Sequence, residues 1–400
     1  MKKIFRKLLG GALLFGLTVS LTSCEDVLGH WEKPTPISIT PTVEEVIKYG
    51  FQLKSLTGAD LTGDATSLKM SNEDGTLVAE AEVSDGKITI KNTDLTAAAV
   101  TAAADFWFEA TVGTRKYVAK VNIDPATLSP ESDKTLTMAT LGDLAGQDGK
   151  FYATKEDIAT AGTTAVGVIA YIGSDAYSES IMDNGGHGLV LCLKDAAKGV
   201  KWGPMSVWEF GESAKVSNTD DLLRSTNVSG YNNTKTLAEK GDAYPACYKA
   251  YHYGEGDGEL QAPIGSSGWF VPSAQQWAKI QQSLGGLDGS TANLTVKLES
   301  SGYYPVIYDS DCTCPQKLDD AIKQAGDGNY DSMISGTYNH LAYWSSSEMT
   351  NDKVVVMSFR YQDDAPKAKG LAWADNSKNS GEPYITPPSP GTYVRTICAF

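Results

Sequence analysis

A run of serines near the C-terminal end of the chain is the stretch whose residue types could do chemistry. Residues 345–347 are all serine, and they follow Trp344 and precede Glu348 in "AYWSSSE". Acyl transfer by serine needs a general base beside the hydroxyl and an oxyanion hole. His340 precedes the run, but side chains along a strand alternate between its two faces. The stretch therefore does not by itself define a nucleophile.

Other catalytic patterns are missing from the sequence. The glycine-flanked "GSSG" at 265–268 is not the G-x-S-x-G elbow of serine hydrolases, and neither H-E-x-x-H nor C-x-x-C occurs. His187 lies in the glycine-rich "NGGHG", where no partner residue for a catalytic role is apparent. We therefore predict a non-enzymatic protein with no catalytic residue, no metal site and no cofactor.

The N-terminal segment has the features of a secretion signal. Basic residues are followed by an apolar run from Leu8 to Leu21, which is too short to cross a bilayer core of roughly 30 Å. Leu21-Thr22-Ser23-Cys24 resembles the bacterial lipobox, which implies a signal peptide at 1–23 and acylation of Cys24 with fatty acids such as palmitate. Glu25-Asp26 resembles the export signal of Bacteroidota surface lipoproteins, which implies a lipid-anchored protein on the cell outer membrane, facing outward.

Charge and cysteine content narrow the possible partners. The net charge of -15 argues against nucleic acid, because phosphates require a basic binding face. Five cysteines follow Cys24, and an odd number cannot form a complete set of intramolecular disulfides. We expect Cys192 and Cys398 to act as small apolar residues in strands, and the cysteine pairing stays open.

The first half of the chain predicts a tether, a β domain and a linker. Residues 24–36 are polar and contain proline, as expected of a tether. Between 37 and 124, alternating segments flank the short turns at Asp85-Gly86 and Gly113-Thr114, which is typical of hairpins. These features predict an immunoglobulin-like sandwich that serves as a spacer or docking domain. The composition of 125–146 predicts a linker.

The remainder, 147–400, predicts strands, two helices and long loops. Ser273 and Gln276 have the S-x-x-Q spacing of a capping box, so a helix is expected to begin after Ser273. A second helix is expected between Pro315 and Gly326, where apolar residues recur at helical spacing. Long stretches rich in glycine, asparagine, serine and tyrosine connect these elements, and such loops are often functional.

Five segments of this region occur in an order that resembles a known family. They are "GLVLCLKDA", "YPACYKAYHYG", "GWFVPSAQQWAKI", "AYWSSSE" and "YVRTICAF", and together they resemble the Fibrobacter succinogenes major paralogous domain family. The resemblance implies an α+β, C-type-lectin-like domain over 147–400, with two helices on a twisted antiparallel sheet. It also implies that Trp344 is buried, that the serines cap a turn, and that Glu348 pairs with Arg395 in the last strand.

Two functional possibilities associated with related folds find less support in the residues. Calcium-dependent lectins use Glu-Pro-Asn and Trp-Asn-Asp, whereas this chain has Glu382-Pro383-Tyr384 and lacks Trp-Asn-Asp. Asp309 and Asp311 leave calcium binding open. The segment "VPSAQQW" looks like part of the formylglycine-generating enzymes, but their "RGGSW" segment has no counterpart. An oxidase of that type is thus the least favoured alternative.

Aromatic residues in loops are the remaining candidates for ligand binding. Trp373 and Tyr384 lie in the polar segment 362–391, and Trp208 lies in "PMSVWEFGES". Aromatic side chains on loops stack on sugar rings or anchor protein partners. We therefore predict a recognition domain that binds a ligand, with a glycan as the first hypothesis. The alternative is an adhesin or assembly subunit that binds a surface protein.

Overall fold

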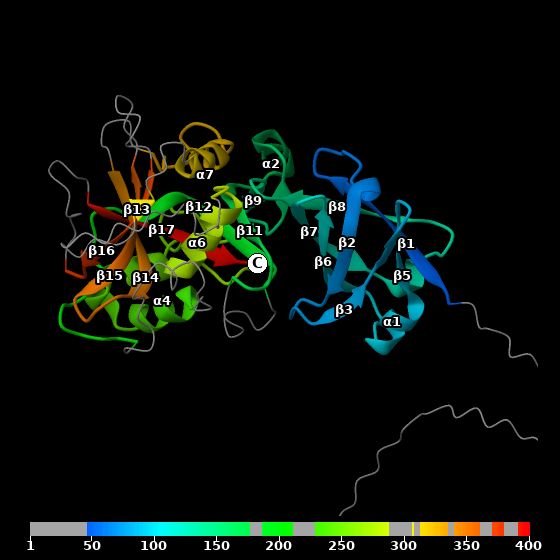
Figure 1. Cartoon of the computed structure of the whole chain (residues 1–400), viewed down its shortest axis with the longest axis horizontal. Helices are drawn as coiled ribbons and strands as arrows, with labels where there is room; N and C mark the ends of the chain where they lie inside the picture. Colours follow the sequence, from blue (N-terminus) through cyan, green and yellow to red (C-terminus); the bar gives the residue numbers. More distant parts are fainter. Residues whose placement is uncertain are drawn as a thin grey trace, which may run out of the picture. The chain divides into compact units, whose positions relative to one another are not determined.

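The first sheet is built from short segments with alternating apolar residues. The computed structural model describes residues 46–176, 186–210, 229–287, 306–307, 313–334, 340–360, 370–379 and 391–400. Eight strands follow the order β3-β2-β6-β7-β8-β1-β5-β4. Figure 1 labels these strands except β4. Their bounds are β1 Lys48–Ser55, β2 Ala65–Ser71, β3 Leu77–Glu80, β4 Glu82–Ser84, β5 Lys87–Lys91, β6 Ala104–Val112, β7 Arg115–Ile123 and β8 Lys134–Thr140. A short helix, α1 (Asn92–Ala97), follows β5.

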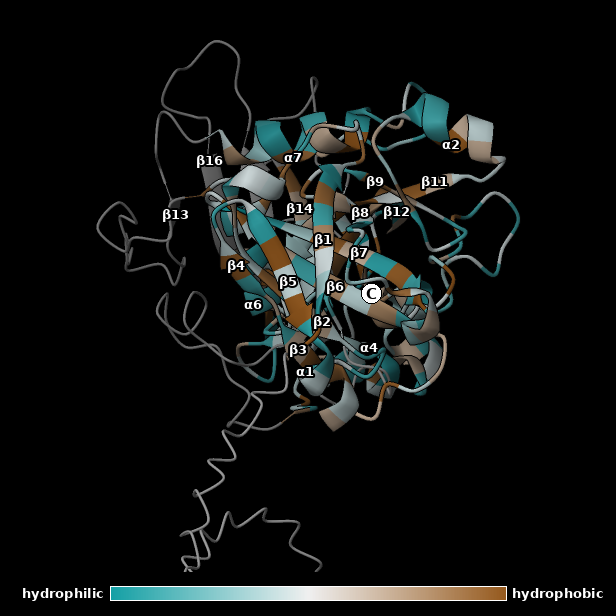
Figure 2. Ribbon diagram, turned by 90° about the vertical axis from the view of Figure 1, so that its right-hand side faces the viewer, coloured by the Kyte–Doolittle hydropathy of each residue, from teal (hydrophilic) through white to brown (hydrophobic). Residues whose placement is uncertain are grey.

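The strands of this sheet share one apolar core. Phe106 and Phe108 of β6 point into it, as do Leu53 of β1 and Leu136 of β8, while Trp107 lies outside this cluster. The period of two along each strand explains this division, because successive side chains point to opposite faces. Figure 2 shows the same alternation along β5, where hydrophobic and hydrophilic residues follow one another.

Both predicted hairpins are confirmed. Ser84 and Lys87 face each other across a two-residue turn, in which Asp85 and Gly86 have φ angles of 50° and 72°. The second hairpin joins β6 to β7 through Gly113, whose φ is 59°. Positive φ at these positions matches the twist of the flanking strands and favours glycine, asparagine and aspartate.

The predicted linker at 125–146 is wrong. Residues 134–140 form β8, which pairs in parallel with β1 and antiparallel with β7. Residues 144–146 already form β9 of the second sheet. Leu136 and Met138 drive this outcome, because their alternation buries both in the first core. Residues Val46–Phe400 form one compact unit.

Among the residues that the structure describes, the second sheet has nine strands and lies beside most of the helices. The strands follow the order β10-β9-β11-β12-β17-β14-β15-β16-β13, and β14 and β17 are parallel neighbours. Their bounds are β9 Leu144–Gly146, β10 Phe151–Tyr152, β11 Ala165–Ile172, β12 Gly188–Ala197, β13 Val306–Ile307, β14 His340–Glu348, β15 Lys353–Arg360, β16 Gly370–Ser377 and β17 Thr392–Ala399.

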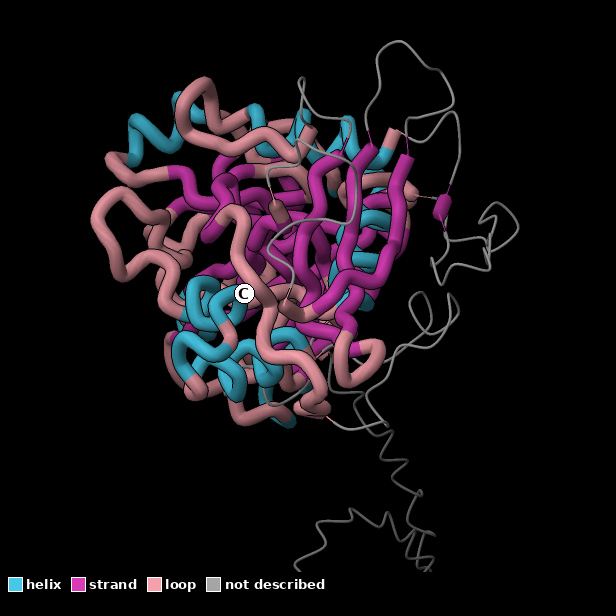
Figure 3. Tube along the Cα trace, turned by 90° about the vertical axis from the view of Figure 1, so that its left-hand side faces the viewer, coloured by secondary structure: helices cyan, strands magenta, loops and turns pink. Residues whose placement is uncertain are grey.

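Helices accompany the second sheet (Figure 3). They are α2 Lys155–Ala161, α4 Gly230–Ala238, α5 Pro245–Tyr251, α6 Ala274–Ser283 and α7 Cys314–Lys323. The combination of two largely antiparallel sheets with separate helices confirms the predicted α+β class.

The two predicted helices are present, and their ends follow from local chemistry. Ser273 Oγ accepts a hydrogen bond from the amide of Gln276 at 3.2 Å, and Gln276 Oε1 accepts one from the amide of Ser273 at 2.9 Å. This reciprocal pair satisfies two amides at the start of α6. The segment after α7 turns at Gly326, whose φ is 87°. The helices α1, α2, α4 and α5 were not predicted, although Thr154 and Asp157 form a capping box at the start of α2 as well.

Several predicted interior residues are buried as expected. Trp344 is fully buried, and its indole N–H donates to the carbonyl of Val200 at 2.8 Å. Cys192 and Cys398 are free and buried in β12 and β17, as predicted for small apolar residues. Burial raises the pKa of the Cys192 thiol to about 11, so it stays protonated and unreactive near neutral pH.

Candidate functional site

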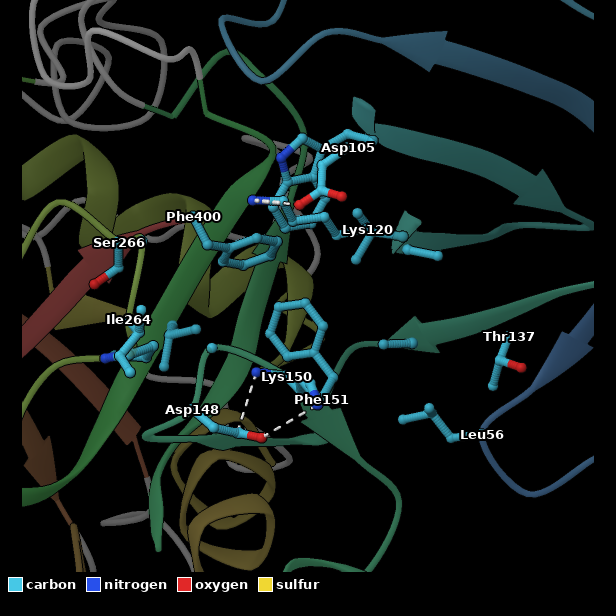
Figure 4. Close-up of a pocket in the computed structure, with 18 residues that line it drawn as sticks. Leu56, Asp105, Lys120, Thr137, Asp148, Lys150, Phe151, Ile264, Ser266 and Phe400 are labelled. Atoms are coloured by element: carbon cyan, nitrogen blue, oxygen red, sulfur yellow. Dashed lines mark hydrogen bonds and ion pairs between the residues drawn. The ribbon is translucent and has the colours of Figure 1, made fainter. Parts of the chain in front are cut away.

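A pocket of about 500 Å³ opens where the outer face of the first sheet meets the second-sheet region (Figure 4). We call it the junction pocket. Its lining combines aromatic and aliphatic side chains with charged and hydroxyl groups: Leu56, Asp105, Trp107, Lys120, Thr137, Asp148, Lys150, Phe151, Ile264, Ser266 and Phe400. Concave sites of this size with a few polar groups are the usual places for small-ligand binding.

The first wall consists of side chains on the outer face of β6, β7 and β8. Trp107 and Lys120 are opposite each other in the register of β6 and β7, and Lys120 Nζ lies 5.8 Å from the Trp107 ring centroid. Lys120 Nζ also lies 3.8 Å from the Asp105 carboxylate. Asn122 holds that carboxylate through a 2.9 Å hydrogen bond. Strand alternation thus places a cation, an anion and an indole on one surface.

The second wall consists of two segments that are joined through their main chains. Ile264 N donates to the carbonyl of Gln147 at 2.9 Å. Gly149 has a φ of 78°, and a Cβ at this position would lie 2.4 Å from the carbonyl oxygen of Ile264. Only glycine fits both the backbone angle and this close approach. Gly149 therefore allows the Asp148–Lys150 turn to lie against Ile264.

Asp148 is oriented by neighbours in the same turn. Tyr152 donates its hydroxyl to Asp148 Oδ2 at 2.7 Å, and the amide of Lys150 donates to Oδ1 at 3.3 Å. Burial and the neighbouring Asp148 raise the pKa of Tyr152 to about 12, so its hydroxyl remains a donor at neutral pH. Lys150 Nζ lies 4.0 Å from Asp148, and the Lys150 side chain is 76% exposed. The cation at this rim is therefore only loosely held.

Three aromatic rings form the floor. The rings of Phe151 and Phe400 meet edge to face at 4.9 Å, and the rings of Phe400 and Trp107 are 5.7 Å apart. The ring of His187 stacks on Trp107 at 4.7 Å, and His187 Nδ1 lies 2.8 Å from Glu109 Oε1. His187 is buried, and its ring takes part in these contacts between the two sheets. Phe151 is half-buried, so it is the ring most accessible to a ligand.

The loop carrying Trp208 lies against the end of β16. Trp208 is half-buried, the carbonyl of its neighbour Val207 accepts from Lys378 Nζ at 2.5 Å, and Met205 Sδ lies 3.0 Å from Ser377 Oγ. Trp373 belongs to β16 and is opposite Met357 in register, but its side chain lies outside the described part. The described contacts therefore do not bring Trp208 and Trp373 into one site.

The remaining predicted positions lie where the structure gives no description. Tyr384, Cys24, the signal peptide at 1–23 and the tether at 24–36 are all outside the described residues. They stay predictions.

The predicted ion pair between Glu348 and Arg395 is wrong. Arg395 pairs with Asp195, whose Oδ1 accepts from the guanidinium at 2.7 and 2.8 Å. Glu348 instead pairs with Lys378 and accepts from the amide of Phe210 at 2.9 Å. The register explains the difference, because Asp195 and Arg395 are opposite each other on β12 and β17. On the other edge of β17, the parallel register with β14 does not place Glu348 opposite Arg395.

The guanidinium of Arg395 occupies a polar site inside the second-sheet region. It donates to the carbonyls of Cys192, Leu193 and Asp331 at 2.8 to 3.0 Å. Although burial opposes its charge, Asp195 outweighs this effect and raises the pKa of Arg395 above its usual range. The residue is therefore a charged structural centre whose side chain is fully buried.

The junction pocket was not predicted from the sequence, although one signal was present. In "DFWFEATV", Trp107 stands between two phenylalanines, so both faces of the strand carry large apolar side chains. A strand with one solvent-exposed face normally alternates apolar with polar residues. The pattern indicated that a second layer covers the outer face of β6, and Phe400 supplies part of that layer.

The comparisons with known proteins leave family and function open. No protein-family model and no curated protein matches the chain. The chain is similar to the crystal structure of a fimbrial protein from Bacteroides ovatus ATCC 8483, with 13% identity and a TM-score of 0.38. That alignment covers 89% of this chain and 71% of the other. Similarity at this level identifies neither a fold nor a function.

Two further observations concern only the residues that the structure describes. No helix among them has the length and apolar character needed to cross a membrane. Within the same ranges, no group of three or more histidine, cysteine, aspartate or glutamate side chains is arranged to hold a metal ion.

Proposed function

We propose that the protein is a lipid-anchored surface protein that binds a glycan in the junction pocket and performs no chemistry on it. The anchor is proposed from the N-terminal segment, in which a short apolar run ends at Leu21 and Cys24 follows three residues later. Recognition is proposed from the junction pocket, which is the observation that carries the function. A bound ligand there would contact both sheets at once.

The chemistry of the lining supports a sugar ligand. A pyranose ring presents an apolar C–H face, which packs against an aromatic ring such as Phe151. Its hydroxyl groups both donate and accept hydrogen bonds. The rim supplies donors on Lys120 and Lys150 and acceptors on Asp105 and Asp148. Aromatic and mixed polar groups therefore match the two kinds of surface on a sugar.

The finer fold assignments also belong to the proposal. We propose that 147–400 is a C-type-lectin-like domain of the Fibrobacter major paralogous family and that the first sheet is immunoglobulin-like. The burial of Trp344, which the resemblance implies, supports the first assignment. The strands of the first sheet share one apolar core, and this arrangement supports the immunoglobulin-like assignment.

A protein ligand is the second candidate, favoured by one observation. Ile264 stands at the pocket with 75% of its surface exposed, and Leu56 lines the opposite side. An exposed apolar residue beside an aromatic floor would also suit an apolar side chain of a protein partner. In this alternative, the protein is an adhesin or an assembly subunit.

A glycan array tests the function and locates the site. The secreted chain from residue 25 onward is expected to bind glycans, and Phe151→Ala is expected to weaken binding at least tenfold. Trp208→Ala is the matched aromatic control and should bind normally. Loss of binding in Trp208→Ala alone would indicate that the binding site is the loop carrying Trp208. Binding of proteins but of no glycans would favour the adhesin alternative.

The anchor needs its own measurement. Cells expressing the full chain are expected to incorporate labelled palmitate into the protein, and Cys24→Ser should abolish incorporation. Surface exposure is checked by adding protease to intact cells. Incorporation that persists in Cys24→Ser would remove the anchor from the proposal without affecting the pocket.

A further inference from the structure

Each wall of the junction pocket presents one cation beside one carboxylate. On the first wall, Lys120 Nζ is 3.8 Å from Asp105, and on the second, Lys150 Nζ is 4.0 Å from Asp148. Lys120 also contacts Glu73 outside the pocket. Figure 4 shows the labelled pairs at separate edges of the pocket. The first-sheet strands supply one pair and the turn before β10 supplies the other.

Both pairs are loose enough to exchange partners with a ligand. All four side chains are partly exposed, from 29% for Asp148 to 76% for Lys150. Exposed pairs at these separations contribute little to stability, because water and salt screen them. A ligand hydroxyl can therefore take the place of the direct ion pair without a large loss.

The balance of signs selects against charged ligands. An acidic group loses hydration on entering the pocket, and a net attraction would be needed to offset that loss. An acidic group entering the pocket would meet attraction from Lys150 or Lys120 and repulsion of similar size from the adjacent aspartate. A hydroxyl group has no such conflict, because it donates to the carboxylate and accepts from the ammonium.

We propose that the junction pocket selects a neutral sugar, one or two units long, and that Asp105 and Asp148 are the residues that exclude acidic sugars. This inference rests on the proposed glycan-binding function. The pocket volume of about 500 Å³ sets the length of the ligand. The sugar's C–H face packs on Phe151, and its hydroxyls bridge the two Asp–Lys pairs. Contact with both walls makes each pair necessary for full affinity.

The test compares neutral disaccharides with the corresponding uronic acids of identical linkage, using the chain from residue 25 onward and isothermal titration. The unmodified protein is expected to bind the neutral sugar at least tenfold more tightly. Asp105→Asn with Asp148→Asn keeps the shapes, leaves Lys150 without its carboxylate and leaves Lys120 paired only with Glu73. This double variant is expected to shift the preference at least tenfold toward the uronic acid.

Matched controls separate a local effect from a change in total charge. Asp242→Asn with Asp257→Asn changes the net charge equally at two exposed positions away from the pocket, and it should leave the preference unchanged. Lys120→Gln and Lys150→Gln, made singly, should each weaken binding of the neutral sugar, because the sugar contacts both walls.

The outcomes distinguish the inference from the function on which it rests. Equal binding of neutral and acidic sugars by the unmodified protein would overturn the inference, as would an unchanged preference in the double aspartate variant. Either result would leave glycan binding intact. Failure of every sugar to bind would overturn the proposed function itself.

Discussion

The two sheets of this protein place their charges differently. In the first sheet, the ion pairs Lys48–Glu82 and Lys69–Glu80 lie on the surface, with side chains between 45% and 60% exposed. In the second-sheet region, Arg395–Asp195 and Lys378–Glu348 are almost completely buried. The first core is apolar, whereas the second contains full charges.

The difference follows from the amount of irregular main chain in each region. Hairpins satisfy most amides and carbonyls of the first sheet through ladder hydrogen bonds. In the second-sheet region, Glu348 accepts from the amides of Glu209 and Phe210, and Arg395 donates to three carbonyls. In this region, buried charged side chains provide the hydrogen-bond partners that regular strand pairing provides for the main chain of the first sheet. They hold irregular segments in a defined position against the sheet.

Removing the Arg395 guanidinium should produce the largest effect. Arg395→Met leaves Asp195 buried without its counter-ion and frees three carbonyls, so the free energy of unfolding is expected to fall by about 3–5 kcal/mol. Urea denaturation measures this change. Combining Arg395→Met with Asp195→Leu should recover part of the loss, because no isolated charge then remains.

The matched control lies in the first sheet. Lys48→Ala removes an exposed pair and should lower the free energy of unfolding far less than Arg395→Met, because water and salt screen the pair. If Lys48→Ala and Arg395→Met cost similar amounts, the contrast between the two regions would not hold.

A second, smaller effect is expected at the connection between the sheets. Asp143 lies between β8 and β9 and accepts from the amide of Thr140 at 2.7 Å. Burial raises the pKa of Asp143 from 3.8 to about 6, although the Thr140 amide opposes the shift. The folded state therefore favours the protonated carboxyl. Its stabilising contribution is fully present below about pH 4 and is lost as the pH rises through 6.

Asp143→Asn should remove this pH dependence. The amide oxygen can still accept from Thr140, and no charge is buried at neutral pH. We expect the variant to be about 1–2 kcal/mol more stable than the unmodified protein at pH 7.5 and equally stable at pH 4. Urea denaturation at the two pH values measures the difference, and an equal gain at both would rule out ionisation as its cause.

The smallest effect is expected at a helix cap. Ser273→Ala removes the hydroxyl that accepts from the Gln276 amide and should cost about 1 kcal/mol. Ser273→Asp should retain most of the stability, since aspartate is also a good cap. A loss well above 1 kcal/mol that Ser273→Asp does not repair would indicate that packing around the fully buried Ser273 matters more than the cap.

Local patterns in the sequence predicted local structure well. The turns at Asp85-Gly86 and Gly113, the cap at Ser273 and the apolar face of α7 depend on residues within a few positions of one another. The linker prediction failed because β8 is stabilised by pairing with β1, far away in the chain. Turn and linker composition does not reveal such a partner. The wrong pairing of Glu348 with Arg395 has the same cause, since it depended on register between strands.

The amino-acid sequence alone determined the alternating strands, the hairpins and the two main helices, because each is set by short-range propensity or composition. A lipid anchor at Cys24 stays a prediction. Only the tertiary structure decided which charges pair and that Trp107, Phe151 and Phe400 line one pocket. These residues come from three distant parts of the chain. Their meeting depends on how the outer face of the first sheet is covered, and long-range burial sets that arrangement.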